Sequence, residues 1–276
     1  MPLGADQLAD MKQQLEDKAK ALDVYGLILI ATEGINATVA GPAEGIFAFK
    51  EFIHNIFGEM RFKDSPAESM PFKRFKVKIK DEIVQLKRTD IQPTGGEPHV
   101  SAQEWDNLID EDAAIIDVRN TYETKIGTFK NAMDPKTEKF SEFPQWVEES
   151  GIPKDKKIGI FCTGGIRCEK AAVAMKELGY KNVYQLDGGI LDYIEQRPNQ
   201  NFTGECFVFD HRMAVGQDLA PSKTYVACWS CGNTGHIPQV CVECEAEYKM
   251  CEECIEDQPV QLCSKNCRYK YQVRQV

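Results

Sequence analysis

A short loop of small residues is the part of this sequence best suited to covalent chemistry. The N–H groups of a tight glycine loop can converge on an anion, and a helix that follows adds the positive end of its dipole. Both effects favour a thiolate and lower the pKa of a cysteine in the loop. A buried structural cysteine is the alternative, but the agreement of strand, glycines, arginine and helix favours a reactive thiol. The loop follows the apolar run 158–161 and consists of Cys162, Thr163, Gly164, Gly165, Ile166 and Arg167, whose guanidinium adds a fork of donors.

Closely spaced cysteine pairs near the end of the chain form a second candidate site. In the cytoplasm, where we expect this protein, such pairs indicate metal ligands more often than disulfides, which are the alternative. Four thiolates make one tetrahedral zinc site, so eight account for two structural zinc ions. His236 could replace one thiolate, and the spacing does not say which pairs share an ion. The candidate ligands are Cys228, Cys231, Cys241, Cys244, Cys251, Cys254, Cys263 and Cys267.

Cations and apolar residues alternate between residues 74 and 80. In a strand, this alternation directs Phe75, Val77 and Ile79 to the core and the cations to solvent, about 6.6 Å apart. Such spacing is on the scale of a phosphate backbone and favours RNA contact over an ordinary solvated strand face. The predicted RNA-binding residues are Arg74, Lys76, Lys78 and Lys80, which Arg61, Lys63, Lys87 and Arg88 could extend.

Length, composition and charge bound the class of protein. The 276 residues predict two or three domains, and 42% hydrophobic and 28% charged residues are typical of a globular protein. The longest apolar run, residues 26–31, is far shorter than the ~20 residues of a membrane span. The N-terminus lacks the features of a signal peptide, so we expect a cytoplasmic protein without a membrane partner. The net charge of −10 does not describe how the charges are distributed along the chain. Residues 243–257, with seven acids and one lysine, carry part of the negative charge.

The Cys162 loop lies within an α/β pattern over residues 98–197. A capping box at Ser101 and Glu104 opens a helix, and a second helix over residues 168–178 ends at Gly179. Short apolar strands that alternate with helices predict a parallel sheet flanked by helices on both faces. A linker is expected at 89–97, and the strands at 113–117, 156–161 and 182–186.

The two flanking regions differ in character. Residues 204–276 lose helical periodicity and form a small Cys-rich module, with Cys206 buried in its first strand. Residues 1–90 predict a split βαββαβ domain of the α+β class. Its expected first strand is not evident, so either the start has been trimmed or the sheet lacks that strand. The expected helices are 6–22 and 43–56, and the strands are 25–31, 37–40, 72–79 and 82–86.

Several of these features resemble the rhodanese sulfurtransferases. The loop 162–167 is similar to their active loop, residues 184–189 to their late strand and turn, and Asp117, Val118 and Arg119, with Glu123 and Gly127, to an earlier motif. Phosphatases that share the fold carry a loop one residue longer, so the loop here is sized for sulfur. The resemblance implies that Cys162 is the nucleophile and that Asp117 and Arg119 position its loop through buried hydrogen bonds.

A wider set of segments resembles the tRNA uridine hydroxylase family, in which a rhodanese domain follows a ferredoxin-like or acylphosphatase-like domain. The resemblance covers roughly residues 7–267. It implies hydroxylation of the wobble uridine of tRNA to 5-hydroxyuridine, with molecular oxygen as co-substrate. No flavin, haem or nucleotide-binding pattern is evident, and nothing in the sequence fixes an oligomeric state. The segments are residues 31–38, 72–78, 126–129, 162–170 and 204–210.

Other roles stay open at this point. Cys168 also belongs to the family pattern, and it could resolve an oxidised Cys162 as a disulfide, accept its sulfur, or only pack the first helical turn. The whole chain could instead be a sulfurtransferase that carries persulfide on Cys162 to a small acceptor or a protein partner. An RNA-binding scaffold without activity is a third hypothesis. The intact loop argues against the scaffold, and the basic strand favours tRNA modification over the sulfurtransferase.

Overall fold

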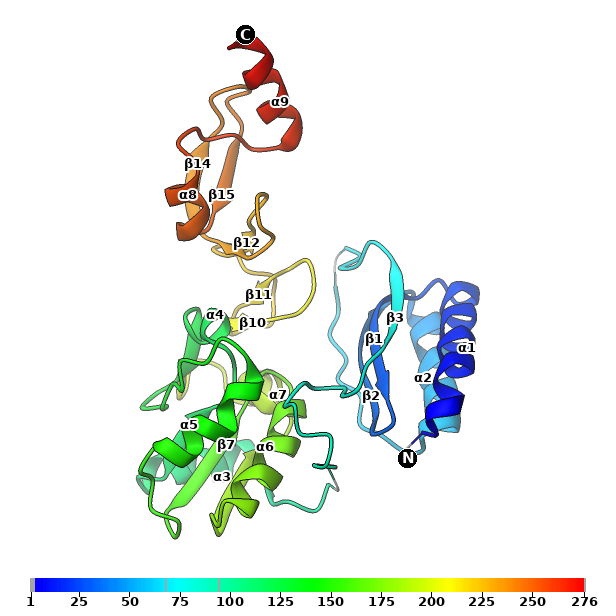
Figure 1. The fold of residues 1–276 in the computed structure, drawn as a ribbon, viewed down its shortest axis with the longest axis vertical. Coiled ribbons are helices and arrows are strands. Elements are labelled where there is room, and N and C mark those ends of the chain that lie inside the picture. Colours follow the sequence, from blue (N-terminus) through cyan, green and yellow to red (C-terminus); the bar gives the residue numbers. More distant parts are fainter. Residues whose placement is uncertain (1–2, 68, 94, 276) are drawn as a thin grey trace. The chain divides into compact units, whose positions relative to one another are not determined.

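The computed structural model describes residues 3–67, 69–93 and 95–275 and divides into two compact units (Figure 1). The first unit comprises Met1–Cys206 with Gln217–Leu219, and the second comprises Phe207–Gly216 with Ala220–Val276. Two α/β cores lie in the first unit, and the cysteine pairs lie in the second. None of the helices in the described residues has the length and apolar character needed to cross a bilayer.

The N-terminal part of the first unit is a three-stranded sheet with two helices on one face (Figure 1). The strand order is β2-β1-β3, so β1 is central and β3 lies at an edge. Side chains of β1 and β3 that face the helices, including Ile28, Ile30 and Val77, are buried in one cluster. The elements are a 3-10 turn Ala5–Gln7, α1 Leu8–Ala21, β1 Tyr25–Ala31, β2 Gly34–Ala40 (antiparallel to β1), α2 Ala43–Phe57 and β3 Phe75–Ile79 (parallel to β1).

Two expectations for this part are wrong. Residues 82–86 do not form a strand, because the segment instead wraps around the buried carboxylate of Glu82. This carboxylate accepts the N–H groups of Leu86 (2.6 Å), Lys87 (3.2 Å) and Arg88 (3.0 Å). Ile79 is 44% exposed rather than buried, since it is the last residue of an edge strand with a neighbour on one side only.

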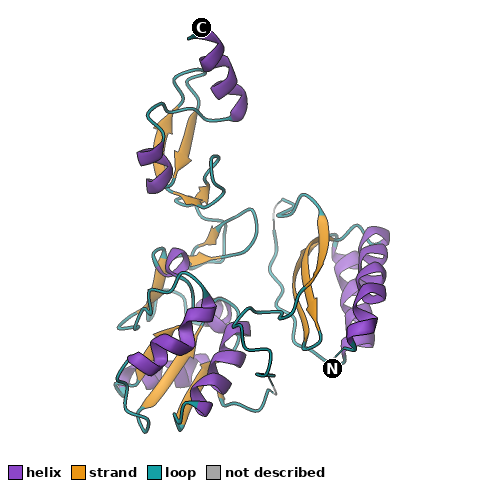
Figure 2. Cartoon of the chain, viewed as in Figure 1, coloured by secondary structure: helices purple, strands orange, loops and turns teal. Residues whose placement is uncertain are grey.

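The middle of the chain folds as predicted, into a parallel sheet flanked by helices (Figure 2). The strand order is β4-β8-β7-β5. α5 and α6 pack together over one face, and α3 and α7 lie together over the other. The strands are β4 His99–Val100, β5 Ala114–Asp117, β7 Lys157–Phe161 and β8 Asn182–Leu186; the helices are α3 Ala102–Asp110, α5 Phe143–Glu149, which follows a 3-10 turn Phe140–Glu142, α6 Ile166–Glu177 and α7 Gly189–Gln196.

Local signals fix the ends of these helices. The hydroxyl of Ser101 accepts the N–H of Glu104, whose carboxylate accepts the N–H of Ser101 in return, as the capping box predicts. Gly179 ends α6 with φ of 91°, a left-handed conformation that glycine adopts without steric cost. α6 begins at Ile166, two residues before the predicted start, so Cys168 lies in its first turn. Sequence patterns missed α4 Thr121–Thr124 and the antiparallel pair β6 Gly127–Phe129 and β9 Phe202–Gly204.

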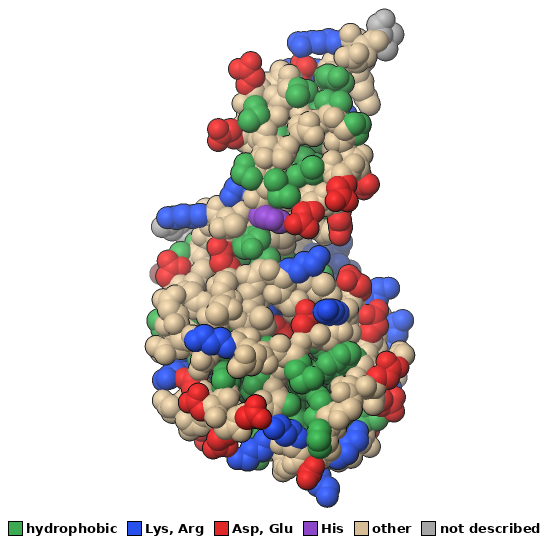
Figure 3. All heavy atoms as spheres, turned by 90° about the vertical axis from the view of Figure 1, so that its left-hand side faces the viewer, with side chains coloured by type: hydrophobic (Ala, Val, Ile, Leu, Met, Phe, Trp, Pro, Cys, Tyr) green, Lys and Arg blue, Asp and Glu red, His purple; other side chains and the backbone are tan. Residues whose placement is uncertain are grey.

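The second unit has little apolar core of its own. Its two buried clusters consist mostly of cysteine side chains, and hydrophobic and charged side chains mix on the surface of this module (Figure 3). Something other than apolar burial must therefore hold it together. Its elements are the hairpins β12 Val226–Ala227 with β13 Thr234–Gly235 and β14 Ile237–Val240 with β15 Glu247–Met250, and the helices α8 Glu252–Asp257 and α9 Lys265–Arg274; before them in the chain, β10 Cys206–Phe207 pairs with β11 Ala214–Val215.

Candidate active site

The loop after β7 wraps backbone donors around the sulfur of Cys162. The Cys162 side chain is fully buried, and the N–H of Gly165 donates to its Sγ at 3.1 Å. Gly165 has φ of 93° and forms the N-cap of α6, so the helix begins directly at the sulfur. Backbone N–H groups of Arg167 and Cys168 contribute to the same anion site. The sulfur thus lies at a helix N-terminus, as the loop sequence predicts.

The surroundings of Cys162 favour its thiolate. Burial opposes ionisation, but a hydrogen bond from the Cys168 thiol, the charge of Arg167 and the backbone donors outweigh it and lower the pKa of Cys162 to about 5. Burial raises the pKa of Cys168 well above its usual range, and the neighbouring Cys162 raises it further. The two sulfurs therefore form a thiolate–thiol pair at neutral pH, with Cys168 as the donor.

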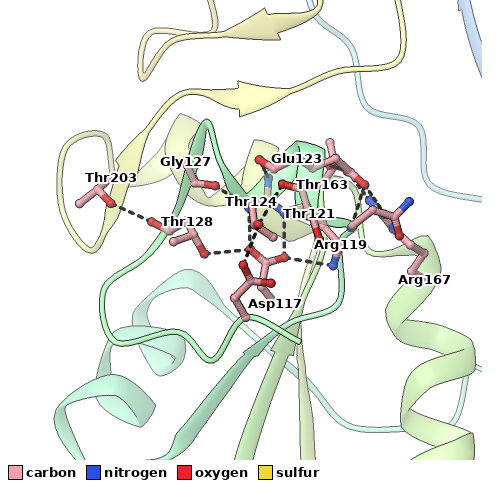
Figure 4. Close-up of polar contacts among 12 residues, drawn as sticks. Asp117, Arg119, Thr121, Glu123, Thr124, Gly127, Thr128, Thr163, Arg167 and Thr203 are labelled. Carbon is pink, nitrogen blue, oxygen red and sulfur yellow. Dashed lines mark hydrogen bonds and ion pairs between the residues drawn. The ribbon is translucent and has the colours of Figure 1, made fainter. Parts of the chain in front are cut away.

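Glu123 holds Arg167 through a bidentate ion pair (Figure 4). The two terminal nitrogens of the Arg167 guanidinium each lie 2.6 Å from a Glu123 carboxylate oxygen. The Thr163 hydroxyl donates to the same carboxylate at 3.3 Å. Burial opposes the charged form of Glu123, but Arg167 outweighs burial and lowers the pKa of this carboxyl. Glu123 therefore fixes both ends of the loop. The sequence motif contained Glu123, but nothing in the pattern identified it as the partner of Arg167.

Asp117 and Arg119 form a buried network of hydrogen bonds next to the Cys162 loop. The Arg119 guanidinium donates to the Asp117 carboxylate at 2.8 and 2.6 Å and to the carbonyl of Gly127 at 2.6 Å (Figure 4). The hydroxyl of Thr128 donates to Asp117 at 2.8 Å. Arg119 also reaches the backbone carbonyl of Glu123 at 3.4 Å. These residues therefore support the segment that carries Glu123, and Arg119 also lies 5.8 Å from the ring of Phe161, which directly precedes the loop.

The N-terminal sheet turns a basic face away from its helices. Leu27 and Leu29 of β1 pair with Lys76 and Lys78 of β3, on the face opposite the helices. Lys76 is exposed and Lys78 is half-buried, while the two outer cations flank β3 rather than belong to it. Within the described residues, no ion pair or side-chain hydrogen bond engages any of the four. They are Arg74, Lys76, Lys78 and Lys80.

The cations predicted to extend this face differ in their contacts. Arg61 pairs with Asp187, in the turn before α7, at 2.7 Å and with Asp192, within α7, at 2.6 Å. Lys63 donates to the carbonyl of Gly164 at 3.2 Å, within the Cys162 loop. These contacts had no signal in the sequence, because they join residues more than 100 positions apart. Arg88 pairs with Asp90 and Glu177, and Lys87 is exposed.

The eight cysteines of the second unit gather into two clusters of four that could hold metal ions. Within each cluster all four sulfurs lie within 4.8 Å of one another. The first pair along the chain joins the third, and the second joins the fourth, so the clusters interleave. His236 lies in neither cluster and approaches Glu252 at 4.0 Å. The clusters are Cys228, Cys231, Cys251 and Cys254, and Cys241, Cys244, Cys263 and Cys267.

Three family descriptions match successive parts of the chain. Residues 3–83 match the UPF0176 acylphosphatase like domain, residues 101–196 the Rhodanese-like domain, and residues 203–268 the Rhodanase C-terminal. These matches confirm the predicted fold class, a rhodanese-like parallel sheet between an acylphosphatase-like domain and a Cys-rich module. Among solved structures, a rhodanese-like domain from Anabaena covers 39% of this chain and 80% of its own, with 19% identity and a TM-score of 0.33.

Similarity to curated proteins extends over most of the length. The tRNA uridine(34) hydroxylase of Bdellovibrio bacteriovorus is 48% identical over 274 residues, which is 96% of this chain and 78% of that protein. The protein of the same name from Wolbachia pipientis wMel is 43% identical over 81% of this chain and 83% of its own. At this identity and coverage, the chain belongs to the tRNA uridine(34) hydroxylase family.

Proposed function

We propose that this chain hydroxylates the wobble uridine of tRNA at C5, giving 5-hydroxyuridine, with the Cys162 thiolate as the reactive group. The observation that carries the proposal is the intact Cys162 loop within a chain whose relatives are named tRNA uridine(34) hydroxylase. The loop is built for a reactive thiolate rather than for packing, because a buried sulfur is ionised and met by backbone donors. We expect the enzyme to act in the cytoplasm.

The net reaction replaces a C–H bond by a C–OH bond, with molecular oxygen as the oxidant. One oxygen atom enters the base and the other leaves as water, so the reaction consumes two electrons and two protons. A thiolate and a thiol supply both electrons and one proton when they close to a disulfide, and the second proton comes from water. Cys162 and Cys168 lie in hydrogen-bond contact and are suited to that role. Arg167, held by Glu123, balances the charge of the thiolate before the reaction.

We assign tRNA binding to the N-terminal domain, residues 1–90, and the hydroxylation reaction to the rhodanese domain, residues 98–197. The cations Arg74, Lys76, Lys78 and Lys80 are free of protein partners among the described residues, so they can take phosphate oxygens without first breaking an ion pair. Phosphate contacts position a nucleic acid without reading its sequence. The choice of tRNA must therefore depend on other parts of the surface.

We further propose that the Cys-rich module, residues 204–276, holds two structural zinc ions. Sulfurs at the corners of a tetrahedron with Zn–S bonds of about 2.3 Å lie about 3.8 Å apart. The separations Cys231–Cys251 (3.6 Å), Cys244–Cys263 (3.5 Å) and Cys263–Cys267 (3.7 Å) come close to that value. A disulfide requires about 2.05 Å, so these cysteines fit metal ligands and not bridges. Zinc here would supply folding free energy and take no part in the reaction.

Mass spectrometry of tRNA nucleosides tests the proposed reaction. Cells that lack the protein are supplied with the wild type, Cys162→Ser or Cys206→Ser. Cys206 is also fully buried, but burial raises the pKa of its thiol to about 12, so it makes a matched control for the substitution. We expect 5-hydroxyuridine with the wild type and the control, and none with Cys162→Ser. Normal levels with a folded Cys162→Ser protein would exclude the proposed role. Persulfide on Cys162 without any change in 5-hydroxyuridine would favour a sulfurtransferase instead.

A further inference from the structure

The first three carbonyl groups of the Cys162 loop each accept a hydrogen bond from a residue outside the loop. The N–H of Ile190 donates to the carbonyl of Cys162 at 3.0 Å, and that of Leu191 donates to the carbonyl of Thr163 at 3.2 Å. Both donors belong to the first turn of α7, which packs directly under the loop. A Cβ on Gly189 would come within 2.5 Å of the Cys162 carbonyl, so only glycine fits beneath it. The rhodanese domain itself therefore orients the first two peptide groups of the loop.

The third peptide group of the loop, between Gly164 and Gly165, also donates to the sulfur. A trans peptide is planar, and its C=O and N–H point in opposite directions. The carbonyl of Gly164 and the N–H of Gly165 belong to one such peptide, and the described residues contain no cis bond. This N–H donates to Cys162 Sγ at 3.1 Å. Whatever holds the Gly164 carbonyl outward therefore also holds a donor on the thiolate.

Lys63 of the N-terminal domain holds that carbonyl. Its Nζ donates to the Gly164 oxygen at 3.2 Å, and it is anchored by a hydrogen bond to the Gly188 carbonyl and by Asp192 at 3.3 Å. The ammonium is therefore held on three sides, and its side chain is only 29% exposed. A flexible glycine pair has many other conformations available, and a charged donor restricts them.

We propose that Lys63 is a positioning residue for the active loop: by fixing the Gly164–Gly165 peptide, it holds a backbone donor against the Cys162 sulfur. The inference rests on the proposed role of Cys162 and extends it, because it makes the reactivity of the rhodanese loop depend on the neighbouring domain. Lys63 does not touch the sulfur, so it acts through the peptide.

The groups that face Cys162 come from several elements. Arg167 and Cys168 belong to α6, and Cys206 approaches from the start of β10. Lys63 instead contacts the carbonyls of Gly164 and Gly188 and the carboxylate of Asp192. A shift in the titration of Cys162 in a Lys63 variant would therefore report the peptide and not a new neighbour.

The test is the pH dependence of Cys162 alkylation by iodoacetamide, followed peptide by peptide with mass spectrometry. The midpoint of the profile gives the apparent pKa of Cys162, whatever the accessibility of the sulfur. Lys63→Met should raise the midpoint by about one pH unit, a tenfold change in the acid constant, because the Gly165 N–H no longer stays on the thiolate. Lys63→Arg keeps a charged donor and should restore most of the wild-type profile.

Two control variants separate this effect from others. Lys50→Met removes an ammonium that pairs with Asp64, next to Lys63 in the chain, and should leave the midpoint unchanged. Arg61→Met removes the ion pairs with Asp187 and Asp192 but no contact with the loop, and should also leave the midpoint unchanged. A Lys63→Met midpoint equal to that of the wild type would overturn the proposal. So would an equal shift in Arg61→Met, which would assign the effect to docking of the segment. No tRNA is needed, so the result is independent of whether Cys162 hydroxylates uridine.

Discussion

Removing the charge of Glu123 should destabilise the active loop far more than the same change at a surface ion pair. Glu123 is fully buried, and both of its oxygens lie 2.6 Å from the Arg167 guanidinium. Glu123→Gln keeps the shape of the side chain, but its amide NH2 would face a guanidinium N–H. Removing one partner of a buried pair leaves the other charge uncompensated, which costs about 3–5 kcal/mol. We expect a loss of that size in the free energy that opens residues 162–170.

Glu111→Gln is the matched control. Glu111 pairs with Lys157 at 2.7 Å, nearly the same distance, but both side chains are more than half exposed. Water screens such a pair, so we expect its change in stability to lie close to the error of measurement. The comparison keeps the chemical change and nearly the same distance, while the burial and the geometry of the pair differ.

Hydrogen exchange with mass spectrometry measures both variants, since the amides of α6 report the local opening free energy. The pH dependence gives a second check. The pKa of Glu123 is lowered in the folded protein, so its contribution is complete above the ordinary value of about 4.3 and is lost as pH falls through the folded pKa. Glutamine does not titrate, so the gap between wild type and Glu123→Gln should narrow in acid. Equal protection in the two variants at neutral pH would refute the reasoning.

Three other results are expected. Reversing Lys76 and Lys78 to Glu should weaken tRNA binding. The slope of log K against log salt should become shallower by about 0.9 for each duplex phosphate that the protein no longer neutralises, or by about 0.7 for a single-stranded one. The same reversal of Lys12 and Lys20 on α1 should have little effect, and an equal effect would show that only net charge matters. Elemental analysis should find about two zinc ions per chain, and a chelator should unfold the Cys-rich module before the parallel sheet; metal-free protein that lacks titratable thiols would indicate disulfides. Cys168→Ala should raise the pKa of the loop thiolate by removing its thiol donor, and an unchanged alkylation profile would contradict that role.

Local patterns determined much of this protein. The capping box at Ser101, the C-cap at Gly179 and the loop around Cys162 all act within a few residues, so their residue types alone specify the backbone. Apolar runs of strand length, alternating with helices, were enough to predict the parallel sheet. The strand predicted over residues 82–86 failed because a tertiary partner overrode its pattern. Glu82 lies buried against Lys170 at 3.1 Å and draws the backbone into a loop.

Contacts between distant residues were decided only by the tertiary structure. The pairing of cysteine pairs one with three and two with four depends on how two hairpins and two helices cross, which spacing does not encode. Glu123 meets Arg167 across 44 residues, and Lys63 meets Gly164 across 101. The sequence shows that a residue is charged, but the fold determines which distant residue it contacts. The reactivity of Cys162 is a prediction from the sequence, whereas the tertiary structure identified the groups that surround its sulfur and hold its loop.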